Sequence, residues 1–272
     1  MIQNINGLTH EQIMHACPSV FAESAHDSRS QRYLYIPTGT VLTALHDAGF
    51  APTTVMQSKS RDITRQDFTK HLIRLRKFDD LGYTKPDVHE VVLVNSHDGT
   101  SAYNLYSGIF RLVCTNGMIV GDIDSTMKVY HKGNNVAGQV VESTLRIVEE
   151  SEEVMNDITE MKQIELSRPE QLLLAEMSLK ARFDVDEEDE QQKEIPYQPQ
   201  DFLRTHRTED VGTDLYRTFN VIQENAIKGG VSRRDRKGQR HTTREIKGID
   251  QNVRVNRLLW ELTQRMKELK QQ

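Results

Sequence analysis

Residues 91–106 read VVLVNSHDGTSAYNLY, and this stretch decides the fold of the chain. Its two ends, Val91–Val94 and Ala102–Tyr106, are rich in the β-branched and aromatic residues that favour strands. Between them stands Ser96-His97-Asp98-Gly99, whose Asp-Gly pair supplies the positive φ angles of a tight turn. The stretch therefore predicts an antiparallel β-hairpin.

Strands are expected on both sides of this hairpin, at Thr53–Ser58, His71–Phe78, Ile109–Thr115, Met118–Val120 and Met127–Tyr130. The alternating charges of His71–Phe78 predict a strand with one solvent-facing side. Asn116-Gly117 has the chemistry of a second tight turn. Residues 33–139 therefore form a predicted β-rich core, and residues 1–32 form a polar segment that is expected to be extended or frayed.

The remainder of the chain has helical periodicity. A short helix is expected from Thr38 or Thr40, either of which is able to cap it, to Gly49. Ser167 and Glu170 stand in capping-box spacing at the start of another helix. We predict an α+β protein in which a largely antiparallel twisted sheet over residues 33–132 packs against helices within 136–183, 208–227 and 252–270. The predicted helical region, residues 140–272, contains an acidic loop (184–194) and a basic loop (228–247).

Composition restricts the function classes. The chain has 272 residues, of which 36% are hydrophobic and 28% charged, and a net charge of −5, so any binding to nucleic acid must be local. Two cysteines, Cys17 and Cys114, do not make a disulfide framework. Cys114 is interpreted as a small buried hydrophobe, Cys17 precedes Pro18 in an ambiguous segment, and neither is expected to be a nucleophile. No signal peptide and no membrane-spanning run are recognised, so we expect a cytoplasmic protein with no membrane partner.

The basic loop is the most informative segment for function. Its cations outnumber Asp235 and Glu245, and they are Lys228, Arg233, Arg234, Arg236, Lys237, Arg240, Arg244 and Lys247. Gly229, Gly230 and Gly238 predict a mobile arm. Such an arm is able to follow a phosphate backbone without reading sequence. The alternative is a solvated loop that pairs with the acidic loop.

A second basic set lies on the predicted strand that begins at His71 and includes Arg74, Arg76 and Lys77. With Tyr33, Tyr35 and Phe78 nearby, it would bind single-stranded nucleic acid by stacking and phosphate contact. The alternative is an ordinary wet face of the sheet.

Evidence for catalysis is weak. Three His-Asp pairs occur, at His26-Asp27, His46-Asp47 and His97-Asp98. The second is predicted at a helix end and the third in a turn, and both positions favour these residues for local hydrogen bonding. Gly121-Asp122-Ile123-Asp124 offers two carboxylates without a third nearby. Phosphate-binding loops, nucleophile elbows and zinc-protease motifs are absent from the sequence. We therefore predict no catalytic residues, no metal and no cofactor, although a dispersed site would escape this test.

The run Ser96-His97-Asp98-Gly99-Thr100-Ser101-Ala102 and the run Phe110–Met118 resemble the core of the phage/plasmid-like family called domain of unknown function 932. Thr243-Arg244 and Asn256–Trp260 resemble its ending. The resemblance implies an origin on prophages, plasmids and genomic islands, often among DNA-processing genes, and supplies no catalytic residues. The predicted order of elements is also similar to that of single-strand annealing proteins.

The leading hypothesis is a non-enzymatic protein that binds nucleic acid, with single-stranded DNA favoured, in recombination or replication of a mobile element. The predicted phosphate contacts are Arg74, Arg76, Lys77, Arg233, Arg234, Arg236, Lys237, Arg240 and Arg244. One alternative is an inhibitor or decoy that binds a host protein through the acidic loop. A second is a metal-dependent nuclease or phosphohydrolase using His26, His46 or His97. The stripe Leu258, Leu262, Met266 and Leu269 is a candidate homo-oligomer contact, or is buried within its own chain.

Overall fold

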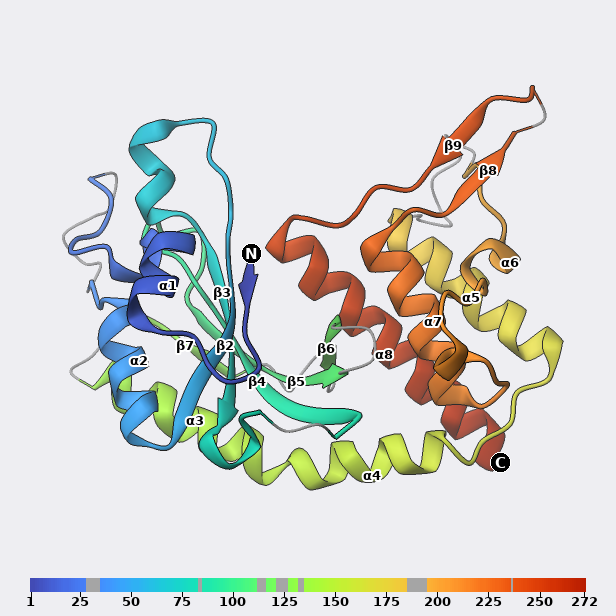
Figure 1. Cartoon of the computed structure of the whole chain (residues 1–272), viewed down its shortest axis with the longest axis horizontal. Helices are drawn as coiled ribbons and strands as arrows, with labels where there is room; N and C mark the ends of the chain where they lie inside the picture. The colour runs from blue at the N-terminus through green and yellow to red at the C-terminus, as the bar shows by residue number, and fades with distance from the viewer. Residues whose placement is uncertain are drawn as a thin grey trace. The chain divides into compact units, whose positions relative to one another are not determined.

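The structure is a computed structural model that describes residues 1–27, 35–82, 85–111, 116–120, 127–131, 135–184, 195–235 and 237–272. The chain divides into two compact units (Figure 1). The first contains residues 1–119 and 124–152, and the second contains residues 120–123 and 153–272. An antiparallel sheet in the first unit and packed helices in both confirm the predicted α+β class.

The sheet of the first unit has the strand order β1-β2-β3-β4-β5-β6, with β7 also paired to β5. Its strands are β1 (Ile2–Gln3), β2 (Phe50–Gln57), β3 (His71–Lys77), β4 (Asp87–Asn95), β5 (Tyr103–Arg111), β6 (Asn116–Val120) and β7 (Met127–Val129). β4 and β5 form the predicted antiparallel hairpin, in which Leu93 faces Leu105. The predicted tight turn is wrong in its length, because β4 ends at Asn95 and β5 begins at Tyr103. Gly99 in this connection has a φ of 80°, as predicted, whereas Asp98 does not have a positive φ.

Helices cover one face of this sheet. They are α1 (His10–Ala16), α2 (Thr38–Asp47) and α3 (Val136–Glu149). The 3-10 turn η1 (Pro18–Phe21) follows α1, whereas η2 (Ile63–Phe68) lies between β2 and β3, and η3 (Phe78–Asp80) lies between β3 and β4. Val41 and Leu45 of α2 and Val140 of α3 pack in one apolar core with Ile73 and Leu93 of the sheet. The same core includes Ile13, Cys17 and Val20. The N-terminal segment is therefore part of the fold rather than frayed, because a capping box between Thr9 and Gln12 starts α1 and β1 pairs with β2.

Two further predictions for the sheet are wrong. β3 has no wet face, because every residue from His71 to Arg76 is buried. Asn116-Gly117 is not a turn but the start of β6. A Cβ on Gly117 would lie 2.1 Å from Cζ of Arg74, so the glycine is needed for close approach of an arginine side chain rather than for a left-handed backbone.

The second unit is helical. Its elements are α4 (Ser151–Met161, which begins in the first unit), α5 (Arg168–Phe183), α6 (Pro199–Phe202), η5 (Thr208–Asp210), α7 (Leu215–Lys228), α8 (Ile249–Gln271), β8 (Ser232–Arg234) and β9 (Arg240–Thr242). The predicted capping box of Ser167 and Glu170 starts α5. Phe219 of α7 meets Trp260 of α8 edge to face, with 5.8 Å between ring centroids. Apolar stripes of α5, α7 and α8 thus form this unit's own core.

The last helix buries most of its apolar stripe within the chain. Met266 is buried, Leu258 and Leu262 are half-buried, and Leu269 is 61% exposed. The oligomer contact stays a prediction. The predicted boundaries at 32 and 139, and the packing of the later helices on the β-rich core, also stay predictions; the division between the compact units falls instead between Glu152 and Glu153, within α4.

Candidate nucleic-acid interface

The predicted mobile arm contains a two-stranded antiparallel hairpin, β8 and β9, which extends away from the helices of its unit (Figure 1). We call residues 232–242 the basic hairpin. Its base is tied down where the backbone N–H of Gly230 donates to the carbonyl of Thr243 over 2.9 Å. Gly229 makes this approach possible, because a Cβ there would lie 2.6 Å from the carbonyl carbon of Arg244.

One carboxylate organises the tip of the hairpin. Oδ1 of Asp235 accepts the backbone N–H groups of Lys237 and Gln239, each over 2.9 Å. Its Oδ2 lies 2.9 Å from Nε2 of His241, and this hydrogen bond is the largest cause of the lowered pKa of Asp235. The sequence interpretation missed this role, although Asp followed three residues later by Gly238 is a type I turn signal.

The chain neutralises only part of the predicted basic set. Arg233 pairs with Asp201 over 3.0 Å, Lys228 pairs with Glu224 over 3.3 Å, and Lys247 lies 3.9 Å from Glu245. Four exposed cations have no carboxylate within ion-pair distance in the described ranges, and they are Arg234, Lys237, Arg240 and Arg244. Arg236 lies outside the described residues.

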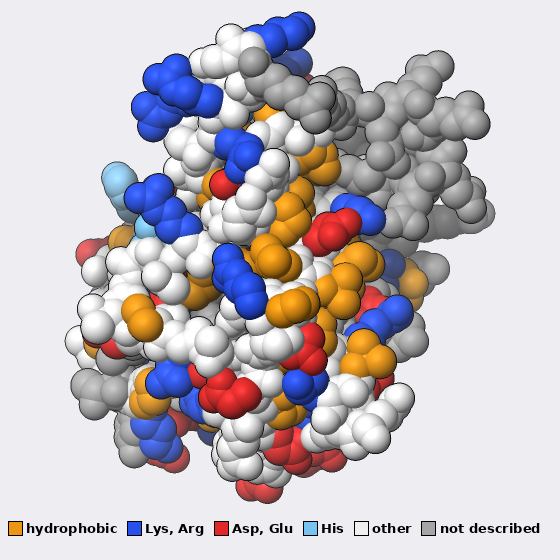
Figure 2. Space-filling view, turned by 90° about the vertical axis from the view of Figure 1, so that its right-hand side faces the viewer, with side chains coloured by type: hydrophobic (Ala, Val, Ile, Leu, Met, Phe, Trp, Pro, Cys, Tyr) orange, Lys and Arg blue, Asp and Glu red, His pale blue; other side chains and the backbone are white. Residues whose placement is uncertain are grey.

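Two of these cations donate hydrogen bonds to neutral groups of the hairpin. Nη1 of Arg234 donates to the carbonyl of Gly238 over 3.0 Å, and Nη2 of Arg240 donates to the hydroxyl of Ser232 over 3.2 Å. Figure 2 shows Lys and Arg side chains gathered at the top of the view, where Figure 1 places β8 and β9. The hairpin therefore presents positive charge to solvent.

A groove of about 570 Å³ lies beside the hairpin, within the second unit. Residues 195–198 form one wall, and hairpin residues including Arg234, Lys237 and His241 form the other. Tyr197 is anchored there by stacking on Phe183, with 5.6 Å between ring centroids. Residues 195–199 carry no charge pattern or motif from which the sequence would predict this wall.

The second basic set is not a surface. Arg74 is 6% exposed and Arg76 is 1% exposed, and both bind the buried carboxylate of Glu90. Only Lys77, at the end of β3, is exposed. The prediction that Arg74 and Arg76 extend a phosphate-binding track is therefore wrong, because an acid on the neighbouring strand draws both guanidinium groups inward. Tyr33 lies outside the described residues.

The acidic loop contributes little that the structure describes. Asp184 pairs with Arg254 over 2.7 Å, and residues 185–194 lie outside the described ranges. Gly121-Asp122-Ile123-Asp124 and Cys114 also lie outside them. Cys17 is buried, and burial raises the pKa of its thiol to about 11, which leaves it protonated at neutral pH.

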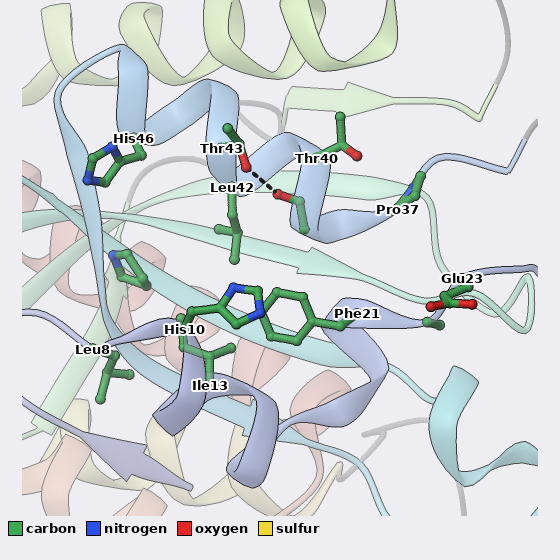
Figure 3. A pocket seen from close by; sticks show the side chains of 13 residues that line it. Leu8, His10, Ile13, Phe21, Glu23, Pro37, Thr40, Leu42, Thr43 and His46 are labelled. Carbon is green, nitrogen blue, oxygen red and sulfur yellow. Dashed lines mark hydrogen bonds between the residues drawn. The ribbon is translucent and has the colours of Figure 1, made fainter.

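A second cavity, of about 710 Å³, lies in the first unit between α1, η1 and α2 (Figure 3). Its floor is apolar, and Leu42 faces Ile13 and Phe21 across it. His10 lies against the ring of Phe21, with 4.2 Å between ring centroids, and His46 stands at one end. None of the described residues that line this cavity is a Lys or an Arg.

The histidine of the predicted central turn belongs to a buried polar network. The hydroxyl of Thr38 lies 2.9 Å from Nε2 of His71, 3.1 Å from Nε2 of His97 and 3.0 Å from Nδ2 of Asn95. Nδ1 of His71 lies 3.0 Å from the hydroxyl of Ser19 and 3.3 Å from the carbonyl of Thr69. When that nitrogen carries the proton, it donates to the carbonyl, and Thr38 donates to Nε2. His97 and Asn95 then donate to Thr38.

Burial keeps these imidazoles neutral. It lowers the pKa of His71 to about 4 and that of His97 to about 3. Asp98 meanwhile accepts the backbone N–H and the hydroxyl of Thr100 within its turn. No group of three His, Cys, Asp or Glu side chains able to hold a metal ion occurs among the residues with described positions. Within the same part of the chain, no helix combines the length and apolarity needed to cross a bilayer.

The family described as "Domain of unknown function (DUF932)" matches residues 25–260. The chain is 40% identical over 260 residues to "UPF0380 protein YfjQ" of Escherichia coli (strain K12). It is also 40% identical over 260 residues to "UPF0380 protein YafZ" of the same strain. In both cases the alignment covers 96% of this chain and 92% of the relative. No solved structure matches the chain.

Proposed function

The chain belongs to the DUF932 family, whose description states no activity, and from the geometry of the basic hairpin we propose that this protein binds nucleic acid. The proposed ligand is single-stranded DNA. The proposed contacts are Arg234, Lys237, Arg240 and Arg244, with Arg236, which lies outside the described residues and stands between Asp235 and Lys237 in the sequence. The protein contributes binding rather than catalysis in this proposal.

The exposed cations that have no carboxylate partner among the described residues are the single observation that carries this proposal. A guanidinium or ammonium group already paired with its own chain releases no counterions when it meets a phosphate, whereas a solvated one does. Arg234 and Arg240 face each other across the register of β8 and β9, so the hairpin holds their charges close together. This arrangement supports contact with successive phosphates of one backbone.

The groove beside the hairpin supports a single strand over a duplex. A single strand exposes its bases, which need a surface next to the phosphate contacts. Pro196 and Tyr197 form an apolar and aromatic wall in the same groove as Arg234 and Lys237. A role in recombination or replication of a mobile element rests on the family resemblance alone and belongs to this proposal.

The test removes charge without altering the fold. A triple variant, Arg234→Gln, Lys237→Gln and Arg240→Gln, is expected to bind a short single-stranded DNA at least about tenfold more weakly at low salt. The measurement is fluorescence anisotropy on labelled oligonucleotides. A matched control removes three charges from exposed helix-borne arginines that pair with their own neighbours, Arg65→Gln, Arg146→Gln and Arg265→Gln.

The control is expected to bind like the unaltered protein. Equal weakening of both triple variants would mean that net charge, not the hairpin, governs binding. Absence of binding by the unaltered protein would reject the proposal. The inhibitor hypothesis then becomes the leading one, and a partner that survives nuclease treatment in a pull-down would favour it.

A further inference from the structure

The arginines withdrawn from the surface form a charged cluster inside the first unit. Nη1 of Arg74 lies 3.1 Å from Oε2 of Glu90, and Nε of Arg76 lies 2.7 Å from Oε1 of the same carboxylate. Glu90 also accepts the hydroxyl of Thr53 over 3.2 Å. One carboxylate thus serves two guanidinium groups, which leaves this cluster with one positive charge more than negative charge.

The surplus charge sits on atoms without partners. Nη1 and Nη2 of Arg76 are buried and have no hydrogen-bond partner within the part of the chain that the structure describes, and the same holds for the hydroxyl of Thr54. Thr54 stands opposite Arg74 in the register of β2 and β3, and opposed residues share one face of a sheet. Arg76 stands opposite Glu90 by continuation of the β3–β4 register, so the three unpartnered atoms belong to the same face.

Phe110 fixes the plane of the unpartnered guanidinium. Cζ of Arg76 lies 4.2 Å from the centroid of that ring, which is a cation–π contact. With Nε held by Glu90 and one face held by Phe110, the Nη1–Nη2 edge is the part of Arg76 left for a ligand. Two parallel N–H donors on a planar edge match the two oxygens of a carboxylate or a phosphate.

We propose that this face of the sheet binds one oxyanion, a carboxylate or a phosphate group, on the Nη1–Nη2 edge of Arg76. The anion supplies the acceptors that these nitrogens lack and neutralises the surplus charge. Water would supply acceptors but no charge. Because Arg76 is 1% exposed, the anion enters during local opening of this face. The site is separate from the basic hairpin and does not depend on the proposed function.

The first experiment uses the full, unaltered chain. Its thermal midpoint is measured in sodium phosphate and in sodium acetate, each against sodium chloride at equal ionic strength. A ligand that binds only the folded state raises the midpoint in proportion to the logarithm of its concentration. We expect a rise with at least one oxyanion, and the arm that gives the larger rise identifies the class. No rise over chloride in either arm would overturn the proposal.

The second experiment tests the residues by calorimetric titration with the more effective anion. Arg76→Lys keeps the charge and removes the planar edge, so affinity is expected to fall about tenfold. Glu90→Gln removes the competing acid, so affinity is expected to rise. Arg65→Lys, an exposed arginine of the same unit that pairs with Asp62, is the matched control and is expected to leave affinity unchanged.

The two substitutions separate an anion site from a structural cluster. If Glu90 and Arg76 only hold the sheet together, both variants lose stability and neither changes affinity in the stated direction. That result would overturn the proposal. If the Glu90 variant does not fold, the Arg76→Lys titration and the midpoint series still decide the matter.

Discussion

Arg74 and Gly117 show how single residues set the structure of the sheet. The guanidinium of Arg74 donates to the backbone carbonyl of Met118 over 3.2 Å, next to a glycine that has no side chain to obstruct it. Burial lowers the pKa of Arg74, and Glu90 opposes that shift. A buried arginine that keeps its charge in this way needs both the carboxylate of Glu90 and the space left by Gly117.

Gly117→Ala should therefore destabilise the first unit. The new Cβ would lie 2.1 Å from Cζ of Arg74, so the arginine or β6 has to move, at an expected loss of about 1–3 kcal/mol. Urea unfolding measures the change. Gly248→Ala is the control, because the nearest atom to its Cβ lies 4.0 Å away. Equal midpoints for the Gly117 variant and the unaltered protein would contradict the packing described.

The buried histidines predict acid sensitivity. His71 and His97 have a pKa of about 4 and about 3 in the folded chain, against 6.5 for the free side chain. Below pH 6.5 the unfolded chain therefore binds protons that the folded chain does not bind. The free energy of unfolding consequently falls as the pH falls. The stability that the two neutral imidazoles confer is fully present above pH 6.5 and is lost progressively towards pH 3 to 4.

The slope of the free energy of unfolding against pH is the measurable quantity. Each buried histidine contributes up to about 1.4 kcal/mol per pH unit in this window. His97→Gln keeps a donor for Thr38 and removes the titrating ring. The free energy of unfolding of this variant should therefore fall less steeply as the pH is lowered. Denaturant unfolding at a series of pH values measures it. An unchanged slope in this variant would mean that His97 is already accessible to protons in the folded state.

At the scale of the element, the sequence predicts those turns and helix ends that depend on residues close together along the chain. The hairpin of β4 and β5 follows from its Asp-Gly pair, and the start of α5 follows from Ser167 and Glu170. The basic loop was predicted as a mobile arm because three glycines and many like charges favour no regular structure. Its order depends on Asp235, a single acid whose hydrogen bonds to the turn are not visible in the charge pattern.

Asp235→Ala should loosen the basic hairpin without disturbing the helices. It removes the acceptor of the backbone N–H groups of Lys237 and Gln239 and the partner of His241. Hydrogen exchange at those two amides is expected to accelerate about five- to tenfold, because each loses a hydrogen bond to a charged group. Amides of α7 serve as the internal reference. Unchanged exchange at the turn would show that another group holds it.

At the scale of the whole molecule, the fold class is predictable from the sequence, but the burial of Arg74 and Arg76 is not. Periodicity identifies strands and helices because each element buries its own face. The fate of Arg74 and Arg76 depends on Glu90, which is 14 residues or more away in sequence, and only strand pairing brings them together. The alternating charges of β3 therefore predict a solvent-exposed face, whereas the structure has a buried ion cluster there.

The same reasoning applies to the basic hairpin, whose binding role stays a prediction. Arg234, Lys237 and Arg240 occur in a segment with an excess of cations, and no acid of the described ranges reaches them. Local charge excess is visible in the sequence, whereas the groove wall at residues 195–198 is not, because it meets the hairpin only after folding. The positive charge of the proposed interface is thus predictable from the sequence, whereas the groove wall beside it is not.

The salt dependence of single-stranded DNA binding tests the central claim most directly. The logarithm of affinity is plotted against the logarithm of salt concentration for the unaltered chain and for the Arg234, Lys237 and Arg240 triple variant. Each lost phosphate contact lowers the slope by about 0.7 for a single strand, so the triple variant should lose roughly 2 from the magnitude of the slope. Identical slopes, or binding that does not respond to salt, would contradict the assignment of the basic hairpin to the phosphate backbone.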